Sequence, residues 1–300
     1  MTAPPRVTLR ARERTLRLGD RPVLMGIVNA TPDSFSDPGE LRGPEDALRR
    51  AAALTEAGAE IIDVGGESAV VDRPAVAPEE EIARVVPVVE LIAARLDVLV
   101  SVDTYKPAVA AAALAAGASM VNDTSGLADP ALADVCAQTG AALVLMHTRA
   151  APKEKVLDHP YTDVGRDVTT FLGERLALAA THGVEAERTI LDPGPDFGKS
   201  PRQTVQALRA LAGLHELGRP VLLAVSRKDF VGAVVHRRPR ERLAGTLAAV
   251  GHGVDAGAHI LRLHDVREAA DFLAVRAVLR GERDLAPAAR VPDELRREAR

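Results

Sequence analysis

The stretch ALTEAGAEIIDVGGES (53–68) contains the pattern from which the fold can be inferred. An Ala-rich segment ends at Gly58, the mostly apolar run EIIDV (60–64) follows, and this run stops at the polar segment GGES (65–68). Helices commonly end in a glycine, and a short apolar run is typical of a buried strand. The stretch therefore predicts the end of a helix, a strand and a polar loop. The same Gly-Ala pair precedes three later apolar runs, at Gly117-Ala118, Gly140-Ala141 and Gly257-Ala258.

Short apolar runs alternate with longer helical segments along most of the chain. We expect strands at 23–29, 60–64, 98–102, 119–122, 142–146, 189–192, 221–225 and 259–263. We expect helices at 44–58, 78–95, 106–117, 130–139, 163–183, 201–217, 239–257 and 265–281. Strands that are apolar throughout favour a parallel sheet covered on both faces, and eight such units in about 260 residues fit a (β/α)8 TIM barrel. A doubly wound open sheet is the alternative, although no GxGxxG follows the first strand.

The predicted barrel spans residues 23–283 and forms one domain. An N-terminal arm, residues 1–22, precedes it, and a charged tail, residues 284–300, follows it. The arm either adds a strand that caps the bottom of the barrel or is disordered, and both readings stay open.

Composition excludes several classes of protein. The net charge of −4 provides no basic field for nucleic acid, and with 2% aromatic residues and no Trp there is little material for stacking on bases. The single cysteine, Cys136, excludes an internal disulfide and is interpreted as a buried apolar residue. No apolar run is long enough for a signal peptide core or a membrane span. We therefore expect a cytoplasmic protein that acts on small molecules.

Polar side chains follow each predicted strand. In a (β/α)8 barrel these positions meet at one face, where active sites lie. A single polar residue at a strand end is usually just solvated, but a set at every strand end favours a shared site. The candidates are Asn29, GGES (65–68), Asp103, Asn122, His147, Asp192, Ser226 to Asp229, Arg262 and His264.

The types of these residues suggest what the site could bind. Asp103 and Asp192 accept hydrogen bonds, Asn122 donates and accepts, and Lys228 donates, which suits a flat heterocycle with adjacent N–H groups and a carbonyl. Arg262, His264 and Asn29 suit a phosphate or pyrophosphate. A site of two carboxylates and Mg²⁺ is a rival reading. A His/Cys metal cluster is disfavoured because the only cysteine lies in a predicted helix, and no nucleophile elbow surrounds Ser226.

Eight segments of this sequence together resemble the dihydropteroate synthase family. They run in the family's order from about Val23 to Arg280: MGIVNATPDSFSD (25–37), GAEIIDVGGES (58–68), SVDTYKPAVAAAAL (101–114), NDTSGL (122–127), LVLMHTRAAP (143–152), LDPGPDFGK (191–199), AVSRKDFVG (224–232) and RLHDV (262–266). The resemblance implies a TIM barrel that condenses 6-hydroxymethyl-7,8-dihydropterin pyrophosphate with p-aminobenzoate, releases pyrophosphate and uses Mg²⁺. Members of this family are commonly homodimers.

The resemblance also implies roles for individual residues. Asn29, Lys228, Arg262 and His264 are the expected catalytic residues. The expected pterin ligands are Asp103, Asn122, Met146, Asp192, Phe197 and Lys228. Asn29, Arg262 and His264 are expected to hold the pyrophosphate, with Asn29 also contacting the metal. The expected acceptor pocket and lid consist of Thr31, Asp33, Phe35, Arg73, Pro74 and Asp229.

Two departures from the family pattern affect the acceptor. The family's GGESTRPG corresponds here to GGESAVVDRPAV (65–76), so that Arg73 and Pro74 follow three additional residues. The family's Ser-Arg-Lys-Ser is Ser226-Arg227-Lys228-Asp229 here, which places an anion where a serine normally helps to hold the p-aminobenzoate carboxylate. Either Asp229 repels this carboxylate, or it turns away and pairs with Arg227, Arg73 or a helix N-terminus.

Three alternatives therefore stay open. The first is a paralogue that binds pterin and uses another amine acceptor. The second is a catalytically silent paralogue that only binds pterin, although the retained pyrophosphate residues argue against it. The third is a barrel that transfers a methyl group from methyltetrahydrofolate, which the loop TPDSFSD (31–37) and the segment 226–228 disfavour.

Overall fold

The chain was analysed as a computed structural model, which describes residues 5–30, 43–68, 74–154, 156 and 159–296. Four residues of the expected acceptor pocket and lid, Thr31, Asp33, Phe35 and Arg73, lie outside these ranges.

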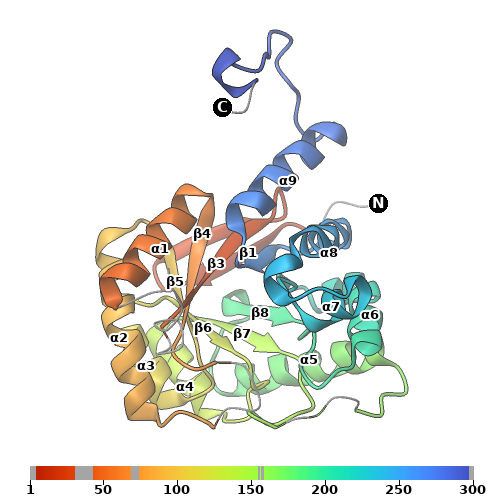
Figure 1. The fold of residues 1–300 in the computed structure, drawn as a ribbon. Helices are drawn as coiled ribbons and strands as arrows, with labels where there is room; N and C mark the ends of the chain where they lie inside the picture. Colours follow the sequence, from red (N-terminus) through yellow and green to blue (C-terminus); the bar gives the residue numbers. More distant parts are fainter. Residues whose placement is uncertain (1–4, 31–42, 69–73, 155, 157–158, 297–300) are drawn as a thin grey trace.

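A closed parallel sheet forms the centre of the molecule (Figure 1). Among the described residues it has eight strands in the order β8-β7-β6-β5-β4-β3-β10-β9. An isolated parallel bridge between Leu191 and Val221 joins its two ends, so the fold is the predicted (β/α)8 barrel. The strands are β3 (Val23–Asn29), β4 (Ala59–Gly65), β5 (Leu99–Asp103), β6 (Met120–Asp123), β7 (Ala142–Met146), β8 (Thr189–Asp192), β9 (Leu222–Leu223) and β10 (Ile260–Leu263).

Helices surround the barrel and cover the outer faces of its strands (Figure 1). They are α1 (Pro44–Glu56), α2 (Pro78–Arg95), α3 (Pro107–Ala115), α4 (Ala131–Thr139), α5 (Val164–Thr181), α6 (Pro201–Arg209), α7 (Asp229–Val235), α8 (Leu243–Asp255) and α9 (Val266–Leu279). Short 3-10 helices include η3 (Leu211–Leu217) and η4 (Pro239–Glu241). No helix in the described part of the chain is long and apolar enough to span a membrane.

Four features differ from the sequence-based expectation. The expected strand 221–225 is regular only at β9, the expected helix 201–217 divides into α6 and η3, and the expected helix 239–257 begins with η4. A short helix, α7, was not predicted. Cys136 is buried as expected, and burial raises the pKa of its thiol to about 12.

The N-terminal arm contributes an antiparallel hairpin formed by β1 (Val7–Ala11) and β2 (Arg14–Leu18). Its side chains Leu9, Ala11 and Leu18 pack with the apolar side chains inside the barrel, including Met25 of β3. Arg12, at the hairpin turn, donates through Nη1 to the carbonyls of Leu114 and Ala118, which lie before β6. The hairpin therefore covers the end of the barrel opposite the carboxyl ends of the strands. The division into an arm, a barrel and a tail stays a prediction.

Candidate active site

The register of the sheet aligns several predicted site residues at the carboxyl ends of the strands. Asn29 is paired with Gly65, Gly65 with Asp103, and Asp103 with Asn122. Met146 is paired with Asp192 farther round the barrel. Asn29 is exposed, whereas Asn122, Met146 and Asp192 are buried. The strand ends thus form one polar mouth, which we call the barrel mouth.

Arg262 of β10 connects four strands across this mouth. Its Nε donates to Asp63 Oδ2 at 2.6 Å and its Nη2 donates to Asp103 Oδ2 at 2.6 Å. Asp63 Oδ2 also accepts a hydrogen bond from Asn122 Nδ2 at 3.0 Å. Arg262 is therefore fixed beside the expected pterin ligands, and both of these carboxylates depend on it for charge compensation.

Asp63 was missing from the predicted site. It lies two residues before the end of β4, inside the apolar run EIIDV, and it is fully buried. A carboxylate inside a buried strand is costly unless it is paired, and this could have identified Asp63 from the sequence. Its Oδ1 has no hydrogen-bond partner among the described residues.

The mouth contains more carboxylates than one guanidinium can neutralise. Burial raises the pKa of Asp103 to about 7; Arg262 opposes this rise, while the negative charge of Asp63 adds to it. Burial also raises the pKa of Asp192. Burial acts to lower the pKa of Arg262, but Asp63 and Asp103 outweigh it and hold this pKa above its ordinary value. A ligand that donates hydrogen bonds would stabilise the carboxylates in their ionised form.

The loop after β8 is built around Asp192 and a buried lysine. Asp192 Oδ1 accepts a hydrogen bond from Gly194 N at 2.7 Å. Lys199 Nζ donates to the carbonyls of Gly194 at 2.8 Å, Phe197 at 3.1 Å and His147 at 3.2 Å. Burial lowers the pKa of Lys199 to about 7. Lys199, another residue that the prediction missed, thus holds this loop against the segment after β7.

Phe197 and Lys228 meet at the same side of the mouth. Lys228 Nζ lies 4.4 Å from the centre of the Phe197 ring, which is a cation–π distance. Burial lowers the pKa of Lys228, and the negative charges of Asp196, Asp192 and Asp103 counter this effect. The structure therefore brings Lys228 close to two of the carboxylates with which it was predicted to act.

The segment after β9 also fixes His264 and Arg227. Ser226 Oγ lies 3.0 Å from His264 Nδ1 and accepts from the His264 backbone N–H at 3.2 Å. Arg227 forms a bidentate pair with Asp265. Burial, followed by the charges of Arg227 and Arg262, lowers the pKa of His264 to about 3, so its imidazole is neutral near pH 7.

Asp229 turns away from the mouth. Its side chain is 83% exposed, and its Oδ1 accepts a hydrogen bond from Arg242 Nη1 at 2.9 Å. Asp229 is also the first residue of α7, where a carboxylate interacts favourably with the helix N-terminus. Of the two expectations for Asp229, the structure has the second at the helix N-terminus, with Arg242 and not Arg227 as the ion-pair partner, while Arg73 lies outside the described residues.

The loop after β4 is anchored through Glu67. Glu67 Oε2 accepts from Lys106 Nζ at 2.6 Å and from Val76 N at 2.8 Å, and Oε1 accepts from the Tyr105 hydroxyl at 3.0 Å. Burial acts to raise the pKa of Glu67, but the bond from Lys106 and its charge lower it overall. Of the two residues of the expected acceptor pocket in this loop, the structure describes Pro74, and this residue is exposed.

Two further features belong to the scaffold. His147, which was a candidate, is buried with Nε2 2.8 Å from Asp167 Oδ1, and burial lowers its pKa to about 3.

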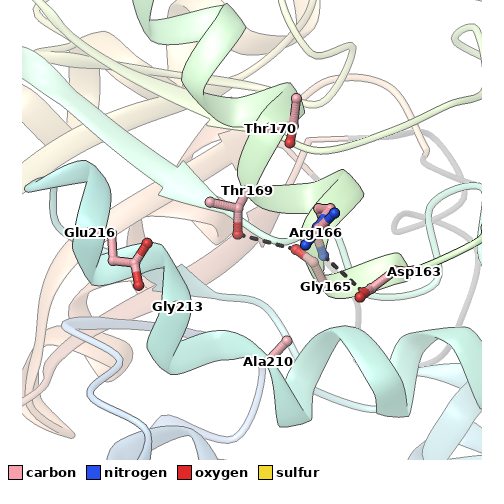
Figure 2. Close-up of a pocket in the computed structure, with 8 residues that line it drawn as sticks. All are labelled: Asp163, Gly165, Arg166, Thr169, Thr170, Ala210, Gly213 and Glu216. Atoms are coloured by element: carbon pink, nitrogen blue, oxygen red, sulfur yellow. Dashed lines mark hydrogen bonds between the residues drawn. The ribbon is translucent and has the colours of Figure 1, made fainter.

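A surface groove lies between α5 and η3, and Asp163, Arg166 and Glu216 line it (Figure 2). Asp163 caps α5 there, and a Cβ on Gly165 would lie 2.5 Å from Ala210, so the groove reflects close packing of the helical layer.

Comparisons with known proteins agree with this geometry. Residues 25–264 match the family of pterin binding enzymes. The chain is 41% identical over 254 residues to the dihydropteroate synthase of Escherichia coli K12, covering 85% of this chain and 90% of that relative. It is 40% identical to the Bacillus subtilis enzyme over 87% of this chain and 90% of that one. The chain belongs to the dihydropteroate synthase family.

Solved structures of dihydropteroate synthases have the same fold. The Xanthomonas albilineans enzyme with 4-aminobenzoic acid superposes with a TM-score of 0.85 at 42% identity, covering 93% of this chain and 99% of that one. The same enzyme in complex with 7,8-dihydropteroate gives a TM-score of 0.81 at 43% identity, covering 90% of this chain and 98% of that one.

Proposed function

We infer that the protein is a dihydropteroate synthase of folate biosynthesis. It condenses 6-hydroxymethyl-7,8-dihydropterin pyrophosphate with p-aminobenzoate and releases pyrophosphate. The observation that carries this inference is the cluster of Asp103, Asn122, Asp192, Lys228 and Arg262 at the mouth of a barrel that belongs to this family. The pairing of Asp229 with Arg242 argues against repulsion of the p-aminobenzoate carboxylate, and the identity of about 40% to dihydropteroate synthases argues against a silent paralogue.

We propose that the pterin ring lies among the buried polar groups of the mouth. Asp103 and Asp192 accept hydrogen bonds from its N–H groups, and Asn122 and Lys228 contact its ring nitrogens and carbonyl. Met146 and Phe197 pack against the ring. Because the carboxylates have raised pKa values, they gain most from a ligand that donates to them.

The residues around Arg262 suit the departure of pyrophosphate. An electron-rich pterin stabilises positive charge on its methylene carbon while the C–O bond breaks, so the reaction requires no covalent nucleophile. Fixed cations at the leaving group are the main requirement, and Arg262 and Lys228 are held in place before the substrate binds. The neutral His264 donates a hydrogen bond to the leaving group. The amine of p-aminobenzoate then attacks the carbon, and its proton passes to solvent or pyrophosphate.

Mg²⁺ is proposed as the cofactor. Asn29 is exposed at the mouth and offers a carbonyl oxygen, and its neighbour Gly65 has no side chain to fill the space beside it. Mg²⁺ is commonly bound by few protein oxygens and by substrate phosphates. No group of three His, Cys, Asp or Glu residues suitable for a metal occurs in the described part of the chain. Asn29 would hold an ion whose other ligands come mainly from pyrophosphate, and the ion would neutralise charge on the leaving group.

Three further proposals concern the setting of the enzyme. Thr31, Asp33, Phe35 and Arg73, which lie outside the described residues, are proposed to contribute to the acceptor pocket together with Pro74. The protein is proposed to act in the cytoplasm. It is a homodimer, which the exposed apolar side chains of Val275 and Leu279 on α9 support. Sedimentation of the wild type and of Leu279→Glu tests the last proposal.

The activity is tested by measuring pyrophosphate release from the pterin substrate with Mg²⁺, with and without p-aminobenzoate. We expect release that depends on p-aminobenzoate and is lost in Lys228→Met and Asp192→Asn. Tight pterin binding with release driven only by a different amine would indicate another acceptor. Pterin binding without any release would indicate a silent paralogue.

A further inference from the structure

Side chains from outside the segment hold the backbone of residues 227–229, which we call the Lys228 turn. Thr246 Oγ1 accepts from Arg227 N at 3.0 Å. Arg242 Nη1 donates to the carbonyls of Arg227 at 2.8 Å and Lys228 at 3.0 Å. Asp229 N donates to Asp196 Oδ2. The turn is therefore held by a guanidinium on one side and by a carboxylate on the other.

Arg242 is built into the packing of this region. Its side chain is largely buried, and its Nε donates to the carbonyl of Arg237 at 2.9 Å. The guanidinium lies directly against Gly232 of α7, because a Cβ at that glycine would lie 2.3 Å from Arg242 Nη2. Arg242 also neutralises Asp229. One side chain thus binds two carbonyls of the turn and the carboxylate that follows them.

Asp196 approaches the turn from the loop after β8. Its backbone has φ of 65°, which is unusual for a residue other than glycine and is tolerated best by Asn and Asp. The conformation is held by Thr204, whose Oγ1 donates to Asp196 Oδ1 at 3.0 Å and accepts from Asp196 N at 3.0 Å. Strained backbone held by several contacts often occurs at functional sites.

Asp196 also influences the side chain of Lys228. The next residue is Phe197, whose ring faces Lys228 Nζ. Among the charges that act on Lys228, Asp196 is the largest that opposes the effect of burial on its pKa; Asp192 and Asp103 act in the same direction, and Arg262 acts against them. Asp196 therefore supports both the backbone and the charge of this lysine.

We propose that Asp196 and Arg242 are positioning residues that clamp the Lys228 turn from two sides and so set the place of Lys228 against Phe197 at the barrel mouth. This inference deepens the proposed function, because its readout through activity depends on that function. It assigns a role to two residues outside the predicted pterin, pyrophosphate and acceptor sets.

The first test compares variants by calorimetric binding of the pterin pyrophosphate substrate with Mg²⁺. Asp196→Gly removes the carboxylate without straining the backbone, whereas Asp196→Asn keeps an acceptor and tolerates the same φ. We expect Asp196→Gly and Arg242→Met to weaken binding by about 10-fold or more, as for lost hydrogen bonds to charged groups. Asp196→Asn should stay within about 3-fold of the wild type. Asp134→Ala, which removes a surface ion pair with His182, is the control and should have no effect.

A second readout separates this inference from the proposed function. Amide hydrogen exchange across residues 225–232 should accelerate in Asp196→Gly and Arg242→Met, with or without substrate, and should be normal in Asp196→Asn and Asp134→Ala. Unchanged exchange in the first two variants would overturn the clamp, whether or not the wild type is active. Normal pterin binding by both variants beside an active wild type would also overturn it. Failure of the wild type to bind pterin, with the exchange pattern intact, would overturn only the function.

Discussion

At the scale of single residues, the barrel mouth is organised by charge compensation. Arg262 is shared between Asp63 and Asp103, and Lys228 lies near Asp192, Asp103 and Asp196. Buried charges in such a network cost free energy in the free protein, and a complementary ligand recovers it. Residue types at the strand ends were sufficient to predict most of this cluster. Asp63 was missed because it lies inside a strand, and the contact between Asp229 and Arg242 was missed because it depends on how α7 and the start of α8 pack together.

The charge of Asp103 should make stability depend on pH. Its folded pKa of about 7 lies above the ordinary value of 3.8, so the folded state binds this proton more tightly than the unfolded state. The proton on Asp103 therefore makes its full contribution to stability below about pH 4, and this contribution is lost as the pH rises through about 7. Asp103→Asn imitates the protonated side chain. The free energy of unfolding of this variant minus that of the wild type should be larger at pH 8 than at pH 5, by about 1 to 3 kcal/mol. Urea unfolding at both pH values tests this, and a difference that does not vary with pH would contradict it.

At the scale of elements, the barrel is well predicted where strands are long and apolar. The bounds of β3, β7 and β8 coincide with the predicted ranges, β4, β5 and β6 shift by one residue at each end, and β10 begins one residue later than predicted. The β1–β2 hairpin was left open because its polar strands depend on packing against the barrel. Helix α7 was missed because its seven residues are too few for a periodic pattern. Short elements that tertiary contacts stabilise carry little signal in the sequence.

Gly194 in the loop after β8 and Gly218 at the end of η3 form a matched pair of glycines. Gly194 and Gly218 both have left-handed backbone, with φ of 62° and 67°. A Cβ at Gly194 would lie 2.0 Å from the carbonyl oxygen of His147, whereas one at Gly218 meets nothing within 4 Å. Gly218→Ala should cost only about 1 to 2 kcal/mol of backbone strain and leave pterin affinity unchanged. Gly194→Ala should cost more and reduce pterin affinity, because the loop that holds Asp192 must move. Thermal unfolding and pterin binding measure both effects, and equal behaviour of the two variants would contradict the account.

At the scale of the whole molecule, the two ends of the barrel have different roles: one forms the candidate active site and the other is closed by packing. One end carries the polar mouth, and the other is filled by the hairpin, whose Leu9 is fully buried with residues of the barrel interior. The segment after α9 extends away from the barrel (Figure 1). Its side chains Leu285, Val291 and Leu295 are exposed. The alternation of eight apolar runs with eight helical segments predicts the barrel. The sequence could not show which end the arm covers, since this depends on contacts between distant segments.

Removal of a side chain from the hairpin should therefore affect stability but not chemistry. Leu9→Ala is expected to lower the free energy of unfolding by about 2 to 5 kcal/mol, as for other buried leucines. Leu285→Ala, in the exposed segment after α9, should change it by less than about 0.5 kcal/mol. Below the unfolding transition, both variants should have wild-type KM for the pterin substrate. A KM defect in Leu9→Ala would show that the hairpin influences the mouth directly.

The most direct test of the central claim is to identify the product by mass after incubating the protein with 6-hydroxymethyl-7,8-dihydropterin pyrophosphate, Mg²⁺ and isotope-labelled p-aminobenzoate. We expect labelled 7,8-dihydropteroate from the wild type and none from Lys228→Met. Hydrolysed pterin alone, or a labelled product formed equally well by Lys228→Met, would contradict it.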